Sequence, residues 1–299
     1  SKRGELMSSK LNNTKEMATG LAWFSIWPIA RTAMLLVFRR KLFWLLFAIA
    51  MLSFIFTFGA IYLLATLKQE LPQMARFITS MLKDLDGSGT TYLNFMKLQG
   101  TVMMILLAFA GSVLAGNDHS RGGFMFYMSR RISLVYYALG KLLAIGLFVL
   151  LITTIPALVL FFEYGLLGDM VEYFRENFQI VFGIIGYGLL LSLSIGLLLL
   201  ALVSWMPRPV PLVILWGGLF VFLPILSSVL AETLRDSEVN LEESSWRLLD
   251  LWNNLYIVGS KFFGVELPLF YGAIIVIFTV CLFSITAIFF RLRYLQHQS

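Results

Sequence analysis

The chain contains little charge. Only 13% of its 299 residues are Asp, Glu, Lys or Arg and 59% are hydrophobic, whereas soluble domains carry about 25% charged residues. These values exclude an ordinary soluble protein. Cysteine is also nearly absent, and the single Cys281 excludes an intrachain disulfide and a cysteine-rich metal site. We therefore expect this chain to bind no metal.

Charged residues are missing altogether from six stretches of 20 or more residues each. A hydrocarbon core about 30 Å thick requires about 20 apolar residues in a helix, and continuous apolarity without strict alternation favours helices over barrel strands. The sequence predicts an all-α polytopic membrane protein with six transmembrane helices. They are expected at about 42–67, 98–116, 138–162, 180–205, 211–231 and 267–290, in a transmembrane domain over 42–290.

Shorter elements are expected around this domain. Residues 1–16 are polar, lack a cleavable signal-peptide pattern and predict a flexible tail. Residues 17–41 alternate apolar residues with Arg31 and Arg39, which predicts an amphipathic elbow helix lying along the membrane surface. Before the last span, Ser244-Ser245 could cap a short helix whose Trp246, Leu249, Trp252 and Tyr256 share one side, which predicts an interfacial helix outside.

The charges divide unequally between the two sides that six spans define. One side, with residues 1–41, 116–141, 204–210 and 291–299, carries 15 Lys or Arg against three acidic residues. The other carries eight against 14. The positive-inside rule therefore places both termini, including the tail 291–299, in the cytoplasm. The protein is expected in the inner membrane of the cell. The basic residues are explained by topology and by contact with anionic lipid headgroups, so no nucleic-acid partner is expected.

The sequence lacks the residues that several classes of enzyme and channel require. The six stretches contain no ionisable Asp, Glu, Lys, Arg or His, and both histidines, His119 and His297, fall in cytoplasmic segments. The nearest match to an ATP-binding loop, Gly140-Lys141-Leu142, lacks the upstream glycine and the hydroxyl, and its lysine is expected to extend to the membrane surface. No potassium-channel filter is present. Calcium binding by Asp84 and Asp86 is a minor alternative, because the other ligands of an EF-hand are missing.

Small residues and prolines mark particular positions in the predicted helices. Helix packing is expected at small residues four positions apart, although a substrate path is an alternative: Gly111, Ala115, Gly188, Ser192 and Gly196. Pro156 and Pro224 are expected to kink their helices near mid-membrane. Such kinks are possible hinges, but they also occur in helices that do not move.

The loop between the second and third predicted helices has a distinctive pattern. It contains Asp118, then Gly122-Gly123, Met128-Ser129 and finally Tyr137-Ala138-Leu139-Gly140-Lys141. This pattern resembles the permease subunits of type-2 ABC exporters, in which an acidic residue, a glycine turn, a Leu-Ser segment and Tyr-x-x-Gly-Lys lie between these helices. The order of elbow helix and six spans is similar too. The chain departs in having Asp118 for the usual Glu, and Arg131-Ile132-Ser133-Leu134 where the family has a proline-containing turn.

The resemblance implies a division of labour between chains. Two permease chains would pair, here as a homodimer by default, and each would dock a separate cytoplasmic ABC ATPase that binds ATP and Mg²⁺. The permease itself would hold no cofactor and catalyse nothing. The implied ATPase contact is a coupling helix in the inner loop, with Asn117, Asp118, His119, Arg121, Phe124 and Arg130. The alternative for these residues is a solvated turn whose charges only set topology.

Two functions are compatible with these features. The first is the membrane-spanning subunit of an ATP-driven exporter with lipid, drug, polymer or other cargo. The alternative is a non-transporting membrane scaffold that anchors a partner complex. An intramembrane enzyme is disfavoured, because ionisable residues in membrane helices are costly and usually functional, and the charge-free stretches have none.

Overall fold

The protein is all-α and contains six helical segments long and apolar enough to cross a membrane. A computed structural model describes residues 26–70, 85–111, 134–206, 208–234 and 241–298, of which 91% are helical and none form strands. The six candidate spans are Lys41–Leu67, Gly89–Gly111, Val135–Leu167, Met170–Trp205, Pro209–Thr233 and Phe270–Arg291. The predicted fold class is therefore confirmed.

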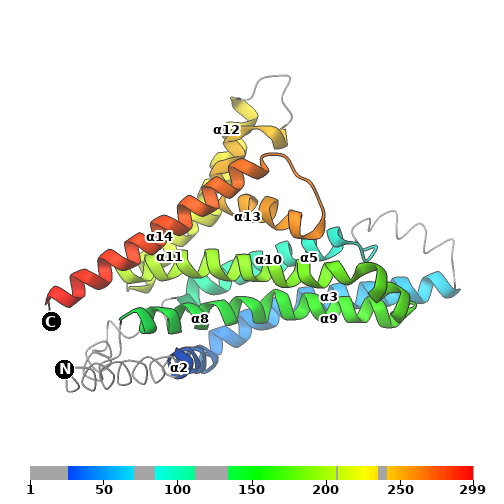
Figure 1. The fold of residues 1–299 in the computed structure, drawn as a ribbon. Helices are drawn as coiled ribbons and strands as arrows, with labels where there is room; N and C mark the ends of the chain where they lie inside the picture. Colours follow the sequence, from blue (N-terminus) through cyan, green and yellow to red (C-terminus); the bar gives the residue numbers. More distant parts are fainter. Residues whose placement is uncertain (1–25, 71–84, 112–133, 207, 235–240, 299) are drawn as a thin grey trace, which may run out of the picture.

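The helices form a bundle with a diverging arm (Figure 1). The bundle contains α3 (Lys41–Glu70), α5 (Gly89–Gly111), α8 (Leu134–Ile152), α9 (Thr154–Leu167) and α10 (Met170–Trp205). The arm contains α11 (Pro209–Gly217), α12 (Leu223–Thr233) and α14 (Phe270–Gln298), and α13 (Leu251–Ser260) lies between arm and bundle.

The helix α10 is the centre of this arrangement. It packs against α5, α8, α9, α13 and α14, and 67% of its most apolar window is buried. The corresponding value is 11% for α3 and 17% for the α11–α12 span and for α14. The peripheral spans therefore present most of their apolar surface outward, as expected of helices that face lipid or another membrane chain.

Two spans begin earlier than predicted. The second begins at Gly89 rather than near 98, and the fourth at Met170 rather than near 180. The predicted limits were placed at charged residues, but Lys97 stays on α5 with its ammonium 3.8 Å from the centre of the Tyr256 ring. Asp169 sets the start of α10, because its carboxylate accepts hydrogen bonds from the backbone N–H groups of Val171 and Glu172.

Both prolines proposed as hinges lie next to irregular backbone. The third span is interrupted at Thr153, between α8 and α9, three residues before Pro156. The fifth span contains a π-helix, η2 (Gly218–Phe222), which ends two residues before Pro224. Proline lacks an N–H and clashes with the carbonyl four residues earlier, which explains why the regular hydrogen-bond ladder is broken at these positions.

The segment between α12 and α14 differs from the single capped helix that we expected. Trp246 and Leu249 lie in the 3₁₀-helix η4 (Ser245–Leu249), whereas Trp252 and Tyr256 lie in α13. The Ser244 side chain caps neither helix. Asp250 separates the two and caps α13 by accepting a hydrogen bond from the Asn253 N–H, because its carboxylate reaches the third helical residue. Two further 3₁₀ turns flank them, η3 (Leu241–Glu243) and η5 (Lys261–Phe263).

The elbow segment contains a separate helix, α2 (Ile26–Phe38), packed across the start of α8. Its Ile29, Ala30, Ala33 and Val37 are buried, whereas Arg31 is exposed. Ile29 lies directly over Gly140 of α8, where a Cβ atom would approach its side chain within 2.8 Å. Lys141, on the next position, is buried rather than extended to the surface.

Tyrosines hold the turn that precedes α5. The Tyr164 hydroxyl donates to the Asp86 carbonyl oxygen at 2.6 Å, and that of Tyr173 to the Gly87 carbonyl oxygen at 2.9 Å. Partial burial raises the pKa of Asp86, but hydrogen bonds from Ser88 and Thr91 outweigh it and hold the pKa below its ordinary value. This carboxylate is thus satisfied within the turn. Asp84, its partner in the alternative calcium site, lies outside the described residues.

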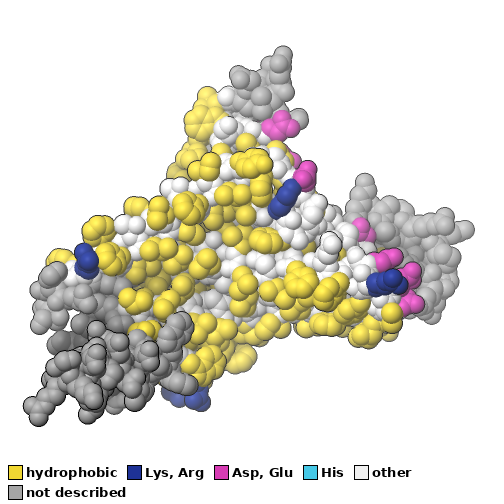
Figure 2. All heavy atoms as spheres, in the orientation of Figure 1, with side chains coloured by type: hydrophobic (Ala, Val, Ile, Leu, Met, Phe, Trp, Pro, Cys, Tyr) yellow, Lys and Arg dark blue, Asp and Glu magenta, His cyan; other side chains and the backbone are white. Residues whose placement is uncertain are grey.

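Charge separates the two ends of the molecule. We call the end with Arg31, Arg39, Arg40, Arg208, Arg291 and Arg293 the basic end; among the described residues it carries no Asp or Glu. The opposite, acidic end carries Asp86, Asp169, Glu172, Glu176 and Glu232 with several basic residues. Figure 2 shows hydrophobic side chains over the surface between them, with acidic side chains only toward the acidic end.

The close approach of α10 to the third span gives a stability prediction. A Cβ atom on Gly188 would overlap the Thr154 hydroxyl and lie 3.2 Å from a methyl of Leu150. Gly188→Val is therefore expected to lower the free energy of unfolding by about 1–3 kcal/mol. The control is Gly59→Val in α3, where a Cβ atom meets nothing within 4 Å. Unfolding in detergent, followed by circular dichroism, should show the loss only for Gly188→Val; equal stability of the two variants would contradict this packing.

Candidate functional site

The residues predicted to contact an ATPase lie outside the part of the chain that the structure describes. Asn117, Asp118, His119, Arg121, Phe124 and Arg130 all lie outside the described residues, as does Ala115. The chain on either side is described: α5 ends at Gly111 and α8 begins at Leu134, both at the basic end. The segment 112–133, which carries the predicted contact, therefore connects these two spans in the sequence.

The other small residues singled out in the sequence face neighbouring helices. Gly188 lies against Thr154, Ser192 donates a hydrogen bond to the Gly146 carbonyl oxygen at 3.2 Å, and a Cβ atom on Gly196 would lie 2.8 Å from a methyl of Leu142. All three lie on α10 and face the third span. Gly111 of α5 faces Leu199 on another side of α10.

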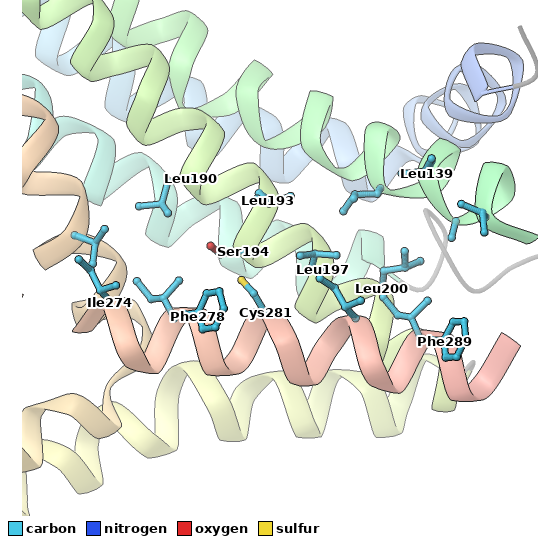
Figure 3. Close-up of a pocket in the computed structure, with 17 residues that line it drawn as sticks. Leu139, Leu190, Leu193, Ser194, Leu197, Leu200, Ile274, Phe278, Cys281 and Phe289 are labelled. Atoms are coloured by element: carbon cyan, nitrogen blue, oxygen red, sulfur yellow. The ribbon is translucent and has the colours of Figure 1, made fainter. Parts of the chain in front are cut away.

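An apolar cleft lies between α8, α10 and α14 (Figure 3). Its volume is about 690 Å³, which is within the range of small-molecule sites. Its walls come from three spans and one residue of α13: Val135, Ala138, Leu139, Leu142, Leu190, Leu193, Ser194, Leu197, Leu200, Val258, Ile274, Ile277, Phe278, Cys281, Ile285, Ile288 and Phe289.

Packing around α10 creates this cleft. One side of α10 is held against α8 by the small residues, and another packs along α14. α8 and α14 consequently face each other across α10 without closing the space between them. Figure 3 shows Leu139 of α8 and Phe289 of α14 on opposite walls, with Ser194 and Cys281 in the middle.

The lining limits what the cleft can do. Ser194 and Cys281 are its polar side chains, and no carboxylate, imidazole, ammonium or guanidinium group is among the residues that line it. Acid–base chemistry needs such a group. The cleft can therefore bind apolar surface and has no group to exchange protons with a ligand at neutral pH. Among the described residues, no cluster of three or more His, Cys, Asp or Glu could hold a metal ion.

α13 closes the space where arm and bundle diverge. It packs against α14, α10, α12 and α5, and a Cβ atom on its Gly259 would overlap the Tyr187 ring of α10. Trp252 lies over Gly100 of α5 in the same way. Yet buried polar atoms in this contact have no hydrogen-bond partner: the Tyr187 hydroxyl, Trp252 Nε1 and Asn254 Oδ1. Such groups are costly, so they lower the stability of the contact between α13 and its neighbours.

Glu163 is an ionisable residue that directly follows the span predicted at 138–162. It lies inside α9, one turn before the end at Leu167, and only 7% of its surface is exposed. Both carboxyl oxygens are buried and have no hydrogen-bond partner. In the sequence, Glu163 interrupts an apolar run, and we interpreted this interruption only as the end of the span. A costly buried carboxyl in a membrane helix is a candidate functional group.

The burial of Glu163 predicts an unusual response to substitution. Glu163→Leu removes an unsatisfied buried polar group at similar volume and should raise the free energy of unfolding by about 1–3 kcal/mol. Glu176→Leu, at an exposed position on α10, is the control and should change it by less than about 0.5 kcal/mol. Thermal unfolding of the purified variants in one detergent measures both. Destabilisation by Glu163→Leu would show that the carboxyl has a partner in the protein.

Comparison with models of protein families, with characterised proteins and with solved structures gives no match for this chain. The function must therefore be inferred from the residues themselves. The relevant features are the apolar cleft, the charge separation and the loop that joins α5 to α8.

Proposed function

We propose that the chain is the membrane-spanning permease subunit of an ATP-driven exporter and that its cleft accommodates an apolar cargo. The observation that carries this proposal is the cleft between α8, α10 and α14, a volume of about 690 Å³ within the spans and without a charged group in its lining. The cleft is open to the surroundings, since lining residues such as Leu193 and Phe278 are exposed, so an apolar ligand could enter it from the bilayer.

The energy for movement would come from a partner. The chain has no ATP-binding loop, and the lining of the cleft has no carboxylate, imidazole or ammonium group that would couple cargo to a proton gradient. The partner would be a cytoplasmic ABC ATPase that holds ATP and Mg²⁺ and contacts the loop with Asn117, Asp118, His119, Arg121, Phe124 and Arg130. Because this loop leads directly into α8, a force on it would act on a wall of the cleft.

The irregular positions in the helices would allow this movement. α8 could tilt about the interruption at Thr153, near Pro156, and α11 relative to α12 about the π-helix before Pro224. The incompletely satisfied contacts of α13 would allow it to leave its position between arm and bundle. Such rigid-body motion about a few backbone positions is common in transporters and other switching proteins.

A second copy of the chain would complete the transporter. The spans of α3, α11–α12 and α14 bury only 11–17% of their apolar windows within one chain. These surfaces are available to a second permease chain and to the lipid bilayer. A closed pair with twofold symmetry is the commonest solution for such an assembly. The termini and the basic end would lie in the cytoplasm, following the positive-inside rule.

The alternative is a membrane scaffold that anchors a partner complex without transport. A scaffold needs the loop at the basic end but not the cleft or its movement. The two functions therefore differ in whether an associated ATPase responds to a ligand. ATP hydrolysis stimulated by an apolar ligand, and lost when Leu193→Trp fills the cleft, would support transport; hydrolysis indifferent to both would support the scaffold.

Copurification tests the ATPase contact. The tagged chain, extracted from the membranes of its own host, should carry Mg²⁺-dependent ATPase activity. Asp118→Asn together with Arg121→Ala should reduce this activity at least about tenfold per mole of chain, because a buried charged contact is worth about 2–5 kcal/mol.

The matched control removes one acidic and one basic residue at the acidic end. Glu172→Gln together with Arg175→Ala, both exposed on α10, should leave the copurified ATPase unchanged. Equal membrane insertion of both double variants is checked by their yields. Full ATPase activity with the Asp118 and Arg121 variant would contradict the proposed contact.

A further inference from the structure

A second apolar groove lies on the other side of α14, at the basic end. It has a volume of about 1160 Å³ and runs between the last turns of α10, one turn of α11 and the final third of the α14 span. The residues that line it are Leu198, Ala201, Leu202, Trp205, Met206, Leu215, Phe283, Ser284, Thr286, Ala287, Phe290, Arg291, Arg293 and Tyr294. It shares none of these with the cleft between α8, α10 and α14.

The interior of this groove is apolar and its few polar groups are already used. The Ser284 and Thr286 hydroxyls donate to backbone carbonyl oxygens one turn earlier on α14, those of Val280 and Leu282. The indole N–H of Trp205 donates to the Ala287 carbonyl oxygen at 3.2 Å. The groove therefore offers hydrocarbon contact and no interior group that would favour a polar occupant.

The mouth of the groove has the opposite character. The Arg291 Nε donates to the Ser204 carbonyl oxygen at 3.0 Å, and its guanidinium lies 5.6 Å from the Trp205 ring centre and 5.5 Å from that of Tyr294. These contacts hold the guanidinium at the groove while its two terminal nitrogens donate to no described residue. Arg293 lies exposed one residue further, over the Phe289 ring. No acidic residue lines the groove.

The depth of these groups in the membrane can be inferred from the spans. Two spans end at the mouth of the groove, one at Trp205 and one at Arg291. Tryptophan, tyrosine and arginine are the residues that anchor spans at the level of lipid headgroups. The groove thus runs from the headgroup level into the hydrocarbon region. The positively charged Arg291 and Arg293 lie where the apolar part ends and the headgroups begin.

We propose that this groove binds an anionic phospholipid, with an acyl chain along α14 and the headgroup phosphate between Arg291 and Arg293. Charge complementarity and the apolar interior select this occupant over a second membrane helix, whose backbone would bring at most the partial negative charge of its C-terminal carbonyl groups to the mouth. The lipid would join α14 of the arm to α10 of the bundle. The proposal does not depend on the ATPase or on transport.

Titration with defined lipids tests the site. The purified full-length chain, delipidated in detergent, is titrated with dioleoyl phosphatidylglycerol or dioleoyl phosphatidylcholine, and bound lipid is counted by native mass spectrometry. The first phosphatidylglycerol should bind roughly 30-fold more tightly than phosphatidylcholine, since each of the two arginines near an anionic headgroup contributes about 1 kcal/mol. Equal affinities for the two lipids would overturn the proposal.

Matched variants locate the charge and the chain. Arg291→Gln with Arg293→Gln should abolish the preference, whereas Arg31→Gln with Arg39→Gln, exposed at the same end on and beside α2, should retain it. Arg291→Lys with Arg293→Lys keeps the charge and should also retain it, which covers the case in which the glutamine variant does not fold. Ala287→Phe fills the groove and should weaken binding of both lipids. A preference unchanged by the glutamine pair, or binding unchanged by Ala287→Phe, would overturn the site.

Discussion

The arrangement of the whole protein depends on the packing of α10 against two different neighbours. Its small residues, Gly188, Ser192 and Gly196, bring it against α8 and α9, because a Cβ atom at the two glycines would collide with the facing helix. Another side of α10 packs along α14. In a bilayer, where helices gain nothing from leaving water, this close van der Waals contact is what holds them together. The space left between α8 and α14 is the apolar cleft.

The remaining features are related to this central helix. α13 lies between α10 and the diverging arm, where its buried polar atoms are incompletely paired. The third span is interrupted at Thr153 and the fifth contains a π-helix, and these are the two positions proposed as hinges. The last turn of α10 also forms part of the groove whose mouth contains Arg291. A rigid central helix with adjustable neighbours is the physical basis of the proposed transport.

Much of the fold could be predicted from the sequence, but the ends of the helices and the candidate site could not. Charge-free runs predict six spans, since charge is costly in hydrocarbon. They misplace the starts of α5 and α10, because Lys97 and Glu176 are carried on helices that extend beyond the apolar run. Glu163 shows a second difficulty, because the sequence alone does not reveal that a charged residue near the end of a span is buried. The cleft depends on contacts between distant segments, which no local pattern specifies.

The central claim is that the width of the cleft changes with nucleotide bound to a partner ATPase. Cys281 is the single cysteine and lies on the α14 side of the cleft, whereas Leu139 lies on the α8 side (Figure 3). Spin labels on Cys281 and on Leu139→Cys therefore report this width by pulsed electron paramagnetic resonance in the complex with its ATPase. The account predicts that the distance distribution shifts when ATP, Mg²⁺ and vanadate are added. Identical distributions with and without nucleotide would contradict it.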